Sequence, residues 1–352
     1  MLAYSDFDVA GLEAFLRERG AKPSHAMKLL RAFYGGFGQI EMAGLDLGKV
    51  LTGELSRQFQ SMQTRVIKEH VSTDGTVKLL VQTSSGETIE SVFMPAFRAD
   101  RSAGCISSQI GCAMGCDFCA STQGGLWRNL SSGEIVEQFL HLQAKAWATG
   151  RRISSLVFMG MGEPMNNLEN VIAAINRIAD PRMGNLGWRH ITVSTVGVVP
   201  GIDALADANL GVCLALSLHA PDDATRSRIV PSNRRWNVAA VLDAAKRFEA
   251  KTGRVVNIEY CLLAGVNDSE EQARLLAGLL EGFAAHVNLI PYNSIGSSLS
   301  GVEYRAPGAQ RLERFTSILR EARVVVHPRI ARGDDVAAAC GQLRQRTNVI
   351  AS

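Results

Sequence analysis

From about residue 105 onward, short apolar runs rich in β-branched residues alternate with longer stretches in which apolar residues recur at helical spacing. The alternation predicts strands that each lead into a helix, the pattern of a parallel sheet covered by helices. An α/β fold with six such units fits a partial (βα)6 TIM-like barrel, in which functional groups lie at the C-terminal strand ends. The predicted strands are 105–109, 155–159, 190–195, 212–219, 255–263 and 287–291, and the predicted helices 132–149, 168–179, 202–208, 238–251, 270–281 and 309–322.

The first hundred or so residues follow other patterns. Two segments, Leu12-Glu-Ala-Phe-Leu-Arg and Ala26-Met-Lys-Leu-Leu-Arg-Ala-Phe, have helical apolar spacing, and residues from 64 to 94 alternate as in a small antiparallel meander. We therefore expect a helical module over 1–62, a β extension over 63–98, the barrel with a C-terminal cysteine loop over 99–340, and a tail over 341–352.

Composition favours a soluble protein of the reducing cytoplasm. Hydrophobic residues make up 46% and charged residues 20% of the chain, and no apolar run is long enough to span a membrane. The first residues lack the basic and then apolar order of a signal peptide. Seven cysteines, an odd number, do not suggest a disulfide framework. We expect no membrane partner and a monomeric chain.

A net charge of +3 permits nucleic-acid binding without requiring it. Basic residues gather near predicted strand ends, although solvated surface charge explains any one pair equally well. These groups are Arg151 with Arg152, Arg226 with Arg228, Arg234 with Arg235, and Arg329 with Arg332.

Three closely spaced cysteines, in the run Cys112-Ala-Met-Gly-Cys116-Asp-Phe-Cys119, indicate an iron-sulfur centre. Thiolates close together on one loop can hold three corners of a [4Fe-4S] cluster and leave the fourth iron open. A structural zinc site is the alternative, but such sites are usually closed by four ligands and often use paired CxxC units. Only Cys116 and Cys119 have CxxC spacing, which favours the cluster.

Polar residues follow several predicted strands and converge if the barrel forms. The glycine-rich turn Met159-Gly-Met-Gly162-Glu163-Pro164 offers amides and a carboxylate that could hold the amino group of an amino-acid-like ligand. Each strand end could be ordinary, but around a cluster loop they indicate a site for S-adenosylmethionine (SAM), whose methionine part can chelate the open iron. The predicted SAM-binding residues are Gly162, Glu163, Ser194, Ser217, Leu218, His219 and Asn293.

Cys340 differs from the other lone cysteines because Gly341 follows it in a loop beyond the barrel. A thiolate free to swing over the strand ends could act as a nucleophile. Cys213 and Cys261 lie inside predicted strands and are expected to be inert.

Together these segments resemble the RlmN/Cfr family of radical SAM RNA methyltransferases, and the resemblance covers nearly the whole chain. Besides the cluster cysteines, it is carried by Cys105-Ile-Ser-Ser-Gln-Ile-Gly-Cys112, Met161-Gly-Glu-Pro, Ser194-Thr-Val-Gly-Val-Val-Pro, Ser217-Leu-His-Ala-Pro, Asn288-Leu-Ile-Pro-Tyr-Asn and Gly333-Asp-Asp-Val-Ala-Ala-Ala-Cys-Gly-Gln-Leu.

The resemblance implies a radical SAM barrel that methylates a ring carbon of adenosine in 23S rRNA, with transfer RNA as a further substrate. Carbon 2 is favoured and carbon 8 is the alternative. Cys340 would carry the methyl group as S-methylcysteine, and Cys105 would release the product by forming a transient disulfide with Cys340. Glu90 would accept the ring proton, unless it is simply an exposed strand residue. Each turnover would use two SAM molecules and electrons from flavodoxin or ferredoxin with its reductase.

RNA must reach the site with its target base unstacked, because a ring carbon inside a helix is inaccessible. The basic residues of the N-terminal module could hold the RNA or merely keep the module soluble; they are Arg17, Arg19, Lys22, Lys28 and Arg31. Two further hypotheses about the function stay open. One is a radical enzyme that acts on a protein or small molecule and would not need Cys340 or Cys105; the other is a non-enzymatic zinc-dependent RNA-binding protein.

Overall fold

A computed structural model describes residues 1–344, and within them the barrel is built on a ten-stranded sheet. The strand order is β14-β13-β12-β11-β10-β9-β6-β5-β4-β3, parallel from β14 to β6 and antiparallel from β6 to β3. The predicted β extension thus continues the barrel sheet without a break. The strands are β3 Arg65–Val71, β4 Val77–Gln82, β5 Thr88–Pro95, β6 Arg101–Cys105, β9 Arg152–Phe158, β10 Ile191–Thr195, β11 Cys213–Ser217, β12 Val256–Leu262, β13 Ala285–Pro291 and β14 Val325–Pro328.

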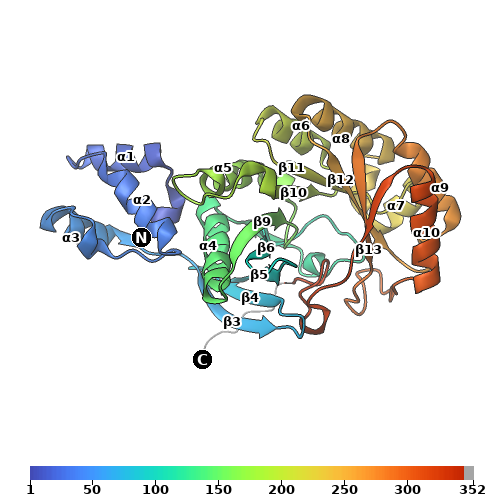
Figure 1. Ribbon diagram of the computed structural model, residues 1–352, viewed down its shortest axis with the longest axis horizontal. Helices are drawn as coiled ribbons and strands as arrows, with labels where there is room; N and C mark the ends of the chain where they lie inside the picture. Colours follow the sequence, from blue (N-terminus) through green and yellow to red (C-terminus); the bar gives the residue numbers. More distant parts are fainter. Residues whose placement is uncertain (345–352) are drawn as a thin grey trace.

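Helices connect the parallel strands and lie on the outer side of the curved sheet (Figure 1). They are α4 Ser132–Ala148, α5 Leu168–Ala179, α6 Val199–Asp207, α7 Asp223–Ile229, α8 Val238–Thr252, α9 Glu270–Leu279 and α10 Ala309–Glu321. Strand β12 shows how the layers form. Ile258 and Tyr260 are buried, and Tyr260 packs on Phe315 of α10, whereas the alternating Glu259 and Cys261 line cavities inside the barrel.

The fold class is confirmed, with differences at individual elements. The predicted strand 105–109 is wrong in position, since β6 ends at Cys105 and a separate short strand, β7 (Gln109–Gly111), pairs with β8 (Leu126–Asn129). The small residues of β6 hide its strand signal but admit α4 closely: a Cβ at Gly104 would lie 2.9 Å from Leu142. Neither β14 nor α7 was predicted, because both are short, with four and seven residues.

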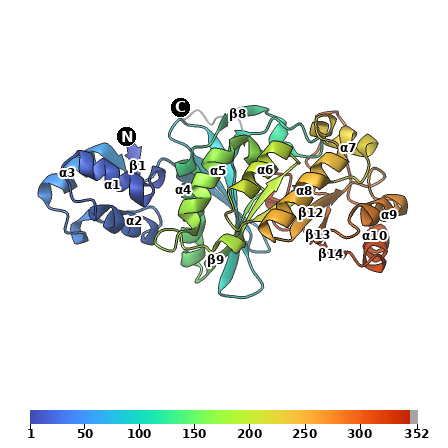
Figure 2. The ribbon, with the colours of Figure 1, turned by 90° about the horizontal axis from the view of Figure 1, so that it is seen from above.

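The N-terminal module lies at one end of the molecule, beside α4 (Figure 2). It contains α1 Val9–Glu18, α2 His25–Gly35, α3 Lys49–Gln58 and a two-stranded sheet of β1 Leu2–Ala3 and β2 Phe59–Gln60. Aromatic rings form much of its core, as where Tyr4 stacks on Phe59 with centroids 4.4 Å apart. Glu137 of α4 joins it to the barrel by accepting hydrogen bonds from Ser5 Oγ (2.6 Å) and from the Thr64 amide (2.7 Å).

None of the helices in residues 1–344 combines the length and apolar character that a bilayer span requires.

Candidate active site

The three clustered cysteines lie on the loop that joins β7 to β8. Gly111 and Gly115 both have positive φ, and a Cβ at Gly111 would fall 1.9 Å from the Gly125 carbonyl oxygen, so this loop needs glycine there. The Cys112 amide donates to that same carbonyl at 2.9 Å. Backbone contacts and glycine conformations therefore define the path of this loop.

Asp117, between two of the cysteines, fixes the loop to the segment after β13. Its carboxylate accepts hydrogen bonds from Tyr304 Oη (2.6 Å), Ser300 Oγ (2.6 Å) and the Ser300 amide (2.9 Å). These bonds hold the pKa of Asp117 below its usual range against the opposing effect of burial. No local pattern in the sequence indicates this role for Asp117.

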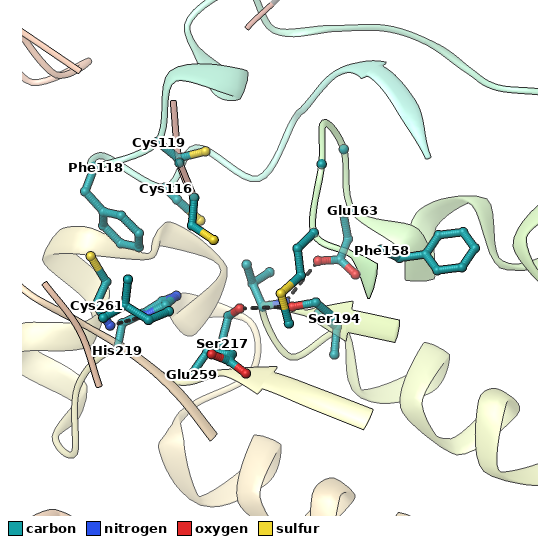
Figure 3. A pocket seen from close by; sticks show the side chains of 18 of the residues that line it. Cys116, Phe118, Cys119, Phe158, Glu163, Ser194, Ser217, His219, Glu259 and Cys261 are labelled. Atoms are coloured by element: carbon teal, nitrogen blue, oxygen red, sulfur yellow. Dashed lines mark hydrogen bonds between the residues drawn. The ribbon is translucent and has the colours of Figure 1, made fainter. Parts of the chain in front are cut away.

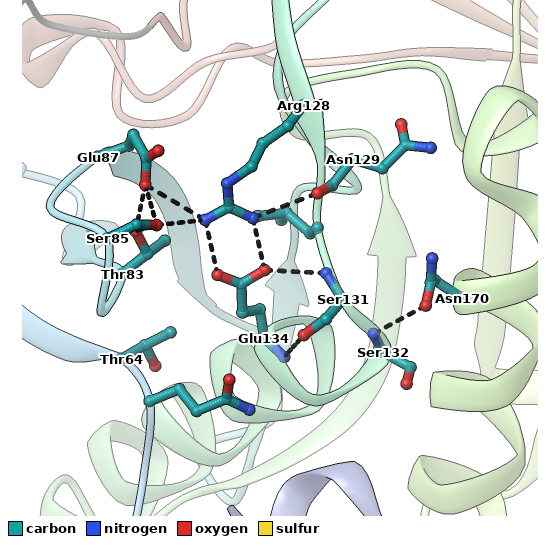
Figure 4. A network of polar contacts seen from close by, with 12 residues as sticks. Thr64, Thr83, Ser85, Glu87, Arg128, Asn129, Ser131, Ser132, Glu134 and Asn170 are labelled. Carbon is teal, nitrogen blue, oxygen red and sulfur yellow. Dashed lines mark hydrogen bonds and ion pairs between the residues drawn. The ribbon is translucent and has the colours of Figure 1, made fainter. Parts of the chain in front are cut away.

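On the other side of the loop, Arg128 of β8 fixes the strand to α4 and to the β4–β5 turn (Figure 4). Its guanidinium forms two bonds to Glu134, at 2.8 and 2.9 Å, and one to Glu87 at 3.2 Å. Glu134 also completes a capping box with Ser131 at the start of α4. The cysteine loop is thus anchored at both ends.

Beneath the loop lies a cavity of about 150 Å³, here named the strand-end cavity, because the C-terminal ends of the parallel strands surround it. Figure 3 shows Cys116 and Cys119 above it, with Glu163 on one side and His219 and Cys261 on the other. Of the predicted SAM-binding residues, Gly162, Glu163, Ser194, Ser217 and His219 line this cavity. Leu218 is fully buried behind it, and Asn293 lies apart with its side chain donating to the Cys340 carbonyl at 3.2 Å.

The turn after β9 holds its carboxylate against backbone amides. Glu163 accepts from Met165 N and Val196 N, both at 3.0 Å, and is 2% exposed. Burial raises its pKa to about 7 in spite of these bonds. Gly162 has φ +98°, and a Cβ there would lie 2.5 Å from the Gln109 side chain, so the turn cannot form with a larger residue.

Arg226, expected among basic groups near strand ends, is instead fully buried beneath the cavity. It donates to three backbone carbonyls of the cavity wall, those of Val196 (2.6 Å), Leu218 (2.9 Å) and Ser217 (3.3 Å). Its role is structural, because no part of it faces solvent. The loss of hydration lowers the pKa of Arg226 to about 10.

The thiol groups of the loop cysteines are suitable ligands for an iron-sulfur cluster. Burial raises the pKa of Cys112 to about 12 and also raises the pKa values of Cys116 and Cys119. Iron would supply the positive charge that thiolates need in such surroundings. Among the described residues, no three Cys, His, Asp or Glu side chains converge as closely as a single metal ion requires.

Cys340 is not free to swing, because its segment is hydrogen-bonded on both sides. Ala120 N donates to the Gly341 carbonyl at 2.7 Å, and Lys78 Nζ donates to the Ala337 carbonyl at 2.8 Å. Asp335 accepts from Ser72 Oγ at 2.6 Å in the turn between β3 and β4. The segment thus runs from the barrel edge to the cluster loop and the β extension. Desolvation raises the pKa of the Cys340 thiol to about 11. Cys340 as a whole residue is exposed, and it lines a cavity.

A second cavity, of about 310 Å³, lies deeper along the same strands and is named here the mid-strand cavity. Cys105 lines it together with Cys340, and Cys340 also lines the strand-end cavity. The structure therefore brings the two predicted catalytic cysteines to one space. All seven cysteines are free thiols, so the structure does not support the expected disulfide.

Glu90 is not an exposed strand residue, since it is 1% exposed on β5. Its carboxylate lies 3.1 Å from Lys78 Nζ and accepts a hydrogen bond from the Arg344 amide at 3.0 Å. The Lys78–Glu90 ion pair thereby contacts the Cys340 segment on both sides of the cysteine.

The five basic residues predicted to hold RNA are all exposed on the N-terminal module. Arg19 is already engaged within the module, where its guanidinium lies 3.6 Å from the Phe15 ring centroid.

The sequence analysis assigned no role to Glu259 or Asn288. A polar residue at alternate positions of an apolar strand is nevertheless a usable signal for a barrel interior.

Known proteins resemble this chain over almost its entire length. It is 50% identical over 342 residues to the probable dual-specificity RNA methyltransferase RlmN 1 of Opitutus terrae, which covers 97% of this chain and 96% of that one. The chain belongs to the RlmN family. The RlmN of Rhodopirellula baltica, named as a probable dual-specificity RNA methyltransferase, is 41% identical over 95% of this chain and 88% of its own.

A match to a superfamily profile and the similarity to a solved structure agree with this family assignment. The Radical SAM superfamily profile matches residues 106–277. The crystal structure of a radical SAM methyltransferase from Sphaerobacter thermophilus superposes with a TM-score of 0.92 at 39% identity, covering 97% of this chain and 99% of that chain. This RlmN-family chain is therefore a radical SAM methyltransferase, and its family implies a [4Fe-4S] cluster and SAM as cofactors. Both the recognition and the class of enzyme predicted from the sequence are confirmed.

Proposed function

We propose that this protein methylates a ring carbon of adenosine in RNA, with carbon 2 favoured, and that Cys340 carries the methyl group. One observation supports this most: Cys340 lines both cavities, and Cys105 lines the second with it. A thiol in that position can meet SAM on one side and a nucleobase on the other. A radical enzyme acting on a small molecule or a protein would need neither cysteine.

Cys112, Cys116 and Cys119 would hold the cluster, and the residues of the strand-end cavity would hold SAM. When bound, the cluster supplies the electron that cleaves SAM into methionine and a 5′-deoxyadenosyl radical. The chain's own part is to position the methionine end near Glu163 and the sulfonium near Cys340. Ser194 and Ser217, whose hydroxyl oxygens lie 3.3 Å apart, offer donors and acceptors to the rest of the molecule.

Cys340 would first attack the methyl group of one SAM and release S-adenosylhomocysteine. A second SAM would provide the radical that removes a hydrogen from this methyl group, and the carbon radical would add to adenine. The adduct would then lose one electron, to the oxidised cluster, and the ring proton, to a protein base. Cys105 would attack the Cys340 sulfur, the departing methylene carbon would take up a proton to become the methyl group of the product, and the disulfide left behind would be opened by a reductant. Glu90, whose carboxylate lies 3.1 Å from Lys78 Nζ, is proposed as the acceptor of the ring proton.

The dual specificity in the names of the relatives favours both 23S rRNA and transfer RNA as substrates. Carbon 8 remains the second candidate position. We further propose a cytoplasmic monomer that receives electrons from flavodoxin or ferredoxin with its reductase and holds RNA partly through the N-terminal module.

The decisive experiment compares Cys340→Ala with Cys213→Ala, a cysteine outside both cavities. Cys340→Ala should retain iron and SAM cleavage but yield no methyladenosine, whereas Cys213→Ala should behave as wild type. Nucleoside mass spectrometry separates 2-methyladenosine from 8-methyladenosine. Retained methylation in Cys340→Ala would refute the covalent route.

A further inference from the structure

The mid-strand cavity contains a buried hydrogen-bond acceptor without a partner. Asn288 of β13 is 3% exposed, and in the described part of the chain its Oδ1 accepts no hydrogen bond. Leaving such a group unsatisfied costs about 1–3 kcal/mol. Each such group in a native structure calls for an explanation, such as stored strain, a catalytic role or a bound water or ion.

The orientation of the Asn288 amide follows from its neighbour. Its Nδ2 donates to Glu259 Oε1 on the adjacent strand at 2.7 Å. An ionised carboxylate only accepts hydrogen bonds, so the opposite amide orientation would place two acceptors against each other. Among residues 1–344, Asn288 provides the sole side-chain or backbone hydrogen bond to the Glu259 carboxylate. Both residues line the mid-strand cavity, and in residues 1–344 the pair holds two acceptor oxygens, Asn288 Oδ1 and Glu259 Oε2, that no hydrogen bond satisfies.

The cavity suits a flat aromatic ring. Its volume of about 310 Å³ lies at the lower end of the range of about 300–1,000 Å³ for small-ligand pockets. Met159 and Ile290 provide apolar walls, and Cys340 and Cys105 line the same space. A ring bound here would lie beside both sulfur atoms that the proposed reaction uses.

The chemistry of the two acceptors selects among nucleobases. Adenine carries an exocyclic amino group with two hydrogens, and asparagine is a common partner of that group in nucleic-acid recognition. Hypoxanthine has a carbonyl oxygen at the same position and would face both acceptors unfavourably. Burial raises the pKa of Glu259, while Arg329, which lines the same cavity, favours its charged form.

We propose that Asn288 and Glu259 form the recognition site for the exocyclic amino group of the target adenine. The inference rests on the proposed RNA methylation and adds the residues that choose the base. The same adenine chemistry is present in SAM itself, so the experiment must separate the two sources.

The test measures kcat/KM for RNA oligonucleotides that carry adenosine, purine riboside or inosine at the position methylated by the wild type. Purine riboside lacks only the amino group. Wild type should prefer adenosine over it by about 100-fold or more, because a site built for a hydrogen bond rejects ligands that lack it. Asn288→Leu should reduce this preference to within about threefold. Thr192→Val, which alters the same cavity without touching an acceptor, should keep the wild-type ratio.

Glu259→Gln tests the same recognition site independently if Asn288→Leu fails to fold. Gln can still accept from Asn288 through its oxygen and would then direct an N–H donor into the cavity. Its preference for adenosine over inosine should fall at least tenfold, because inosine offers an acceptor there. A structural role alone would slow all three substrates equally and leave the ratios unchanged, which would overturn the proposal.

SAM provides the second arm of the test. Asn288→Leu should bind SAM and form 5′-deoxyadenosine as wild type does. Weaker SAM binding with retained base selectivity would place the adenine of SAM at this site and overturn the proposal. Wild-type enzyme that methylates no adenosine would instead refute the proposed function itself.

Discussion

The two cavities on either side of Cys340 are built differently. Short local motifs form most of the strand-end cavity: the cysteine loop, the turn at Gly162 and Glu163, and the ends of β10 and β11. Residues of β12, β13 and the C-terminal segment complete it. The mid-strand cavity is formed by residues from β5, β6, β12 and β13 and by the C-terminal segment, which are far apart in the sequence. Under the proposed function, the radical would form in the first cavity, and the second would decide which atom the radical reaches.

The largest expected effect comes from removing a cluster ligand in the strand-end cavity. Cys116→Ala should lose most of its iron, and both SAM cleavage and RNA methylation should fall by at least about 1,000-fold, because loss of the centre removes the electron source. Iron analysis, visible absorbance and 5′-deoxyadenosine assays check this result, with Cys213→Ala as the control. A variant that kept its cluster and its activity would show that these three cysteines are not the ligands.

Removing the buried guanidinium beneath the same cavity should destabilise the fold. Arg226→Met leaves the carbonyl groups of Val196 and Ser217 without donors, and we expect a loss of about 3 kcal/mol in the free energy of unfolding. Arg228→Met, on the exposed side of the same helix, is the matched control and should change the free energy by less than about 0.5 kcal/mol. Equal effects in urea unfolding would contradict the structural role of Arg226.

Loosening the C-terminal segment should separate the two cavities functionally. Asp335→Ala removes the bonds to Ser72 Oγ and to the Thr73 amide (3.1 Å), so Cys340 should be less well placed. RNA methylation is expected to fall about tenfold while 5′-deoxyadenosine formation without RNA stays within twofold of wild type. Asp207→Ala, on the outer helix α6, serves as the control. A parallel loss of both activities would mean that the segment supports the whole fold.

The smallest effect is a pH dependence that arises outside both cavities. Burial lowers the pKa of His141 to about 4, so acidification below its ordinary value of 6.5 favours the unfolded state, which takes up the proton more readily. The free energy of unfolding of the chain with His141 should fall as the pH drops from 6.5 to 4. Over the same range, the free energy of unfolding of His141→Asn should fall by about 1–2 kcal/mol less than that of the chain with His141. Both chains carry Glu137→Gln in this comparison, because Glu137, with a pKa raised to about 7, shares the Thr64 hydroxyl with His141. Identical pH profiles would show that His141 does not titrate this way.

The sequence predicted elements with strong periodicity and motifs that are local. Helix α8 was expected over 238–251 and extends over Val238–Thr252, and the cysteine loop lies where its spacing indicated. Prediction failed where the signal was short or masked: β6 has the sequence Arg-Ser-Ala-Gly-Cys, and its strand character comes from pairing with β5 and β9. Arg226 was counted among surface charges because burial of an arginine depends on five acceptors that no local pattern reveals.

By itself, the sequence determined the class of fold and the family, and it predicted the cluster loop, the strand-end residues and the role of Cys340, because each is a matter of residue type and nearby spacing. Only the tertiary structure decided that Cys340 is held between two cavities, that Glu90 is paired with Lys78, and that Asn288 donates to Glu259 in the wall of the second cavity. Burial and hydrogen bonding between distant strands depend on how the sheet closes, and that closure joins residues more than two hundred positions apart, as Lys78 and Ala337 show.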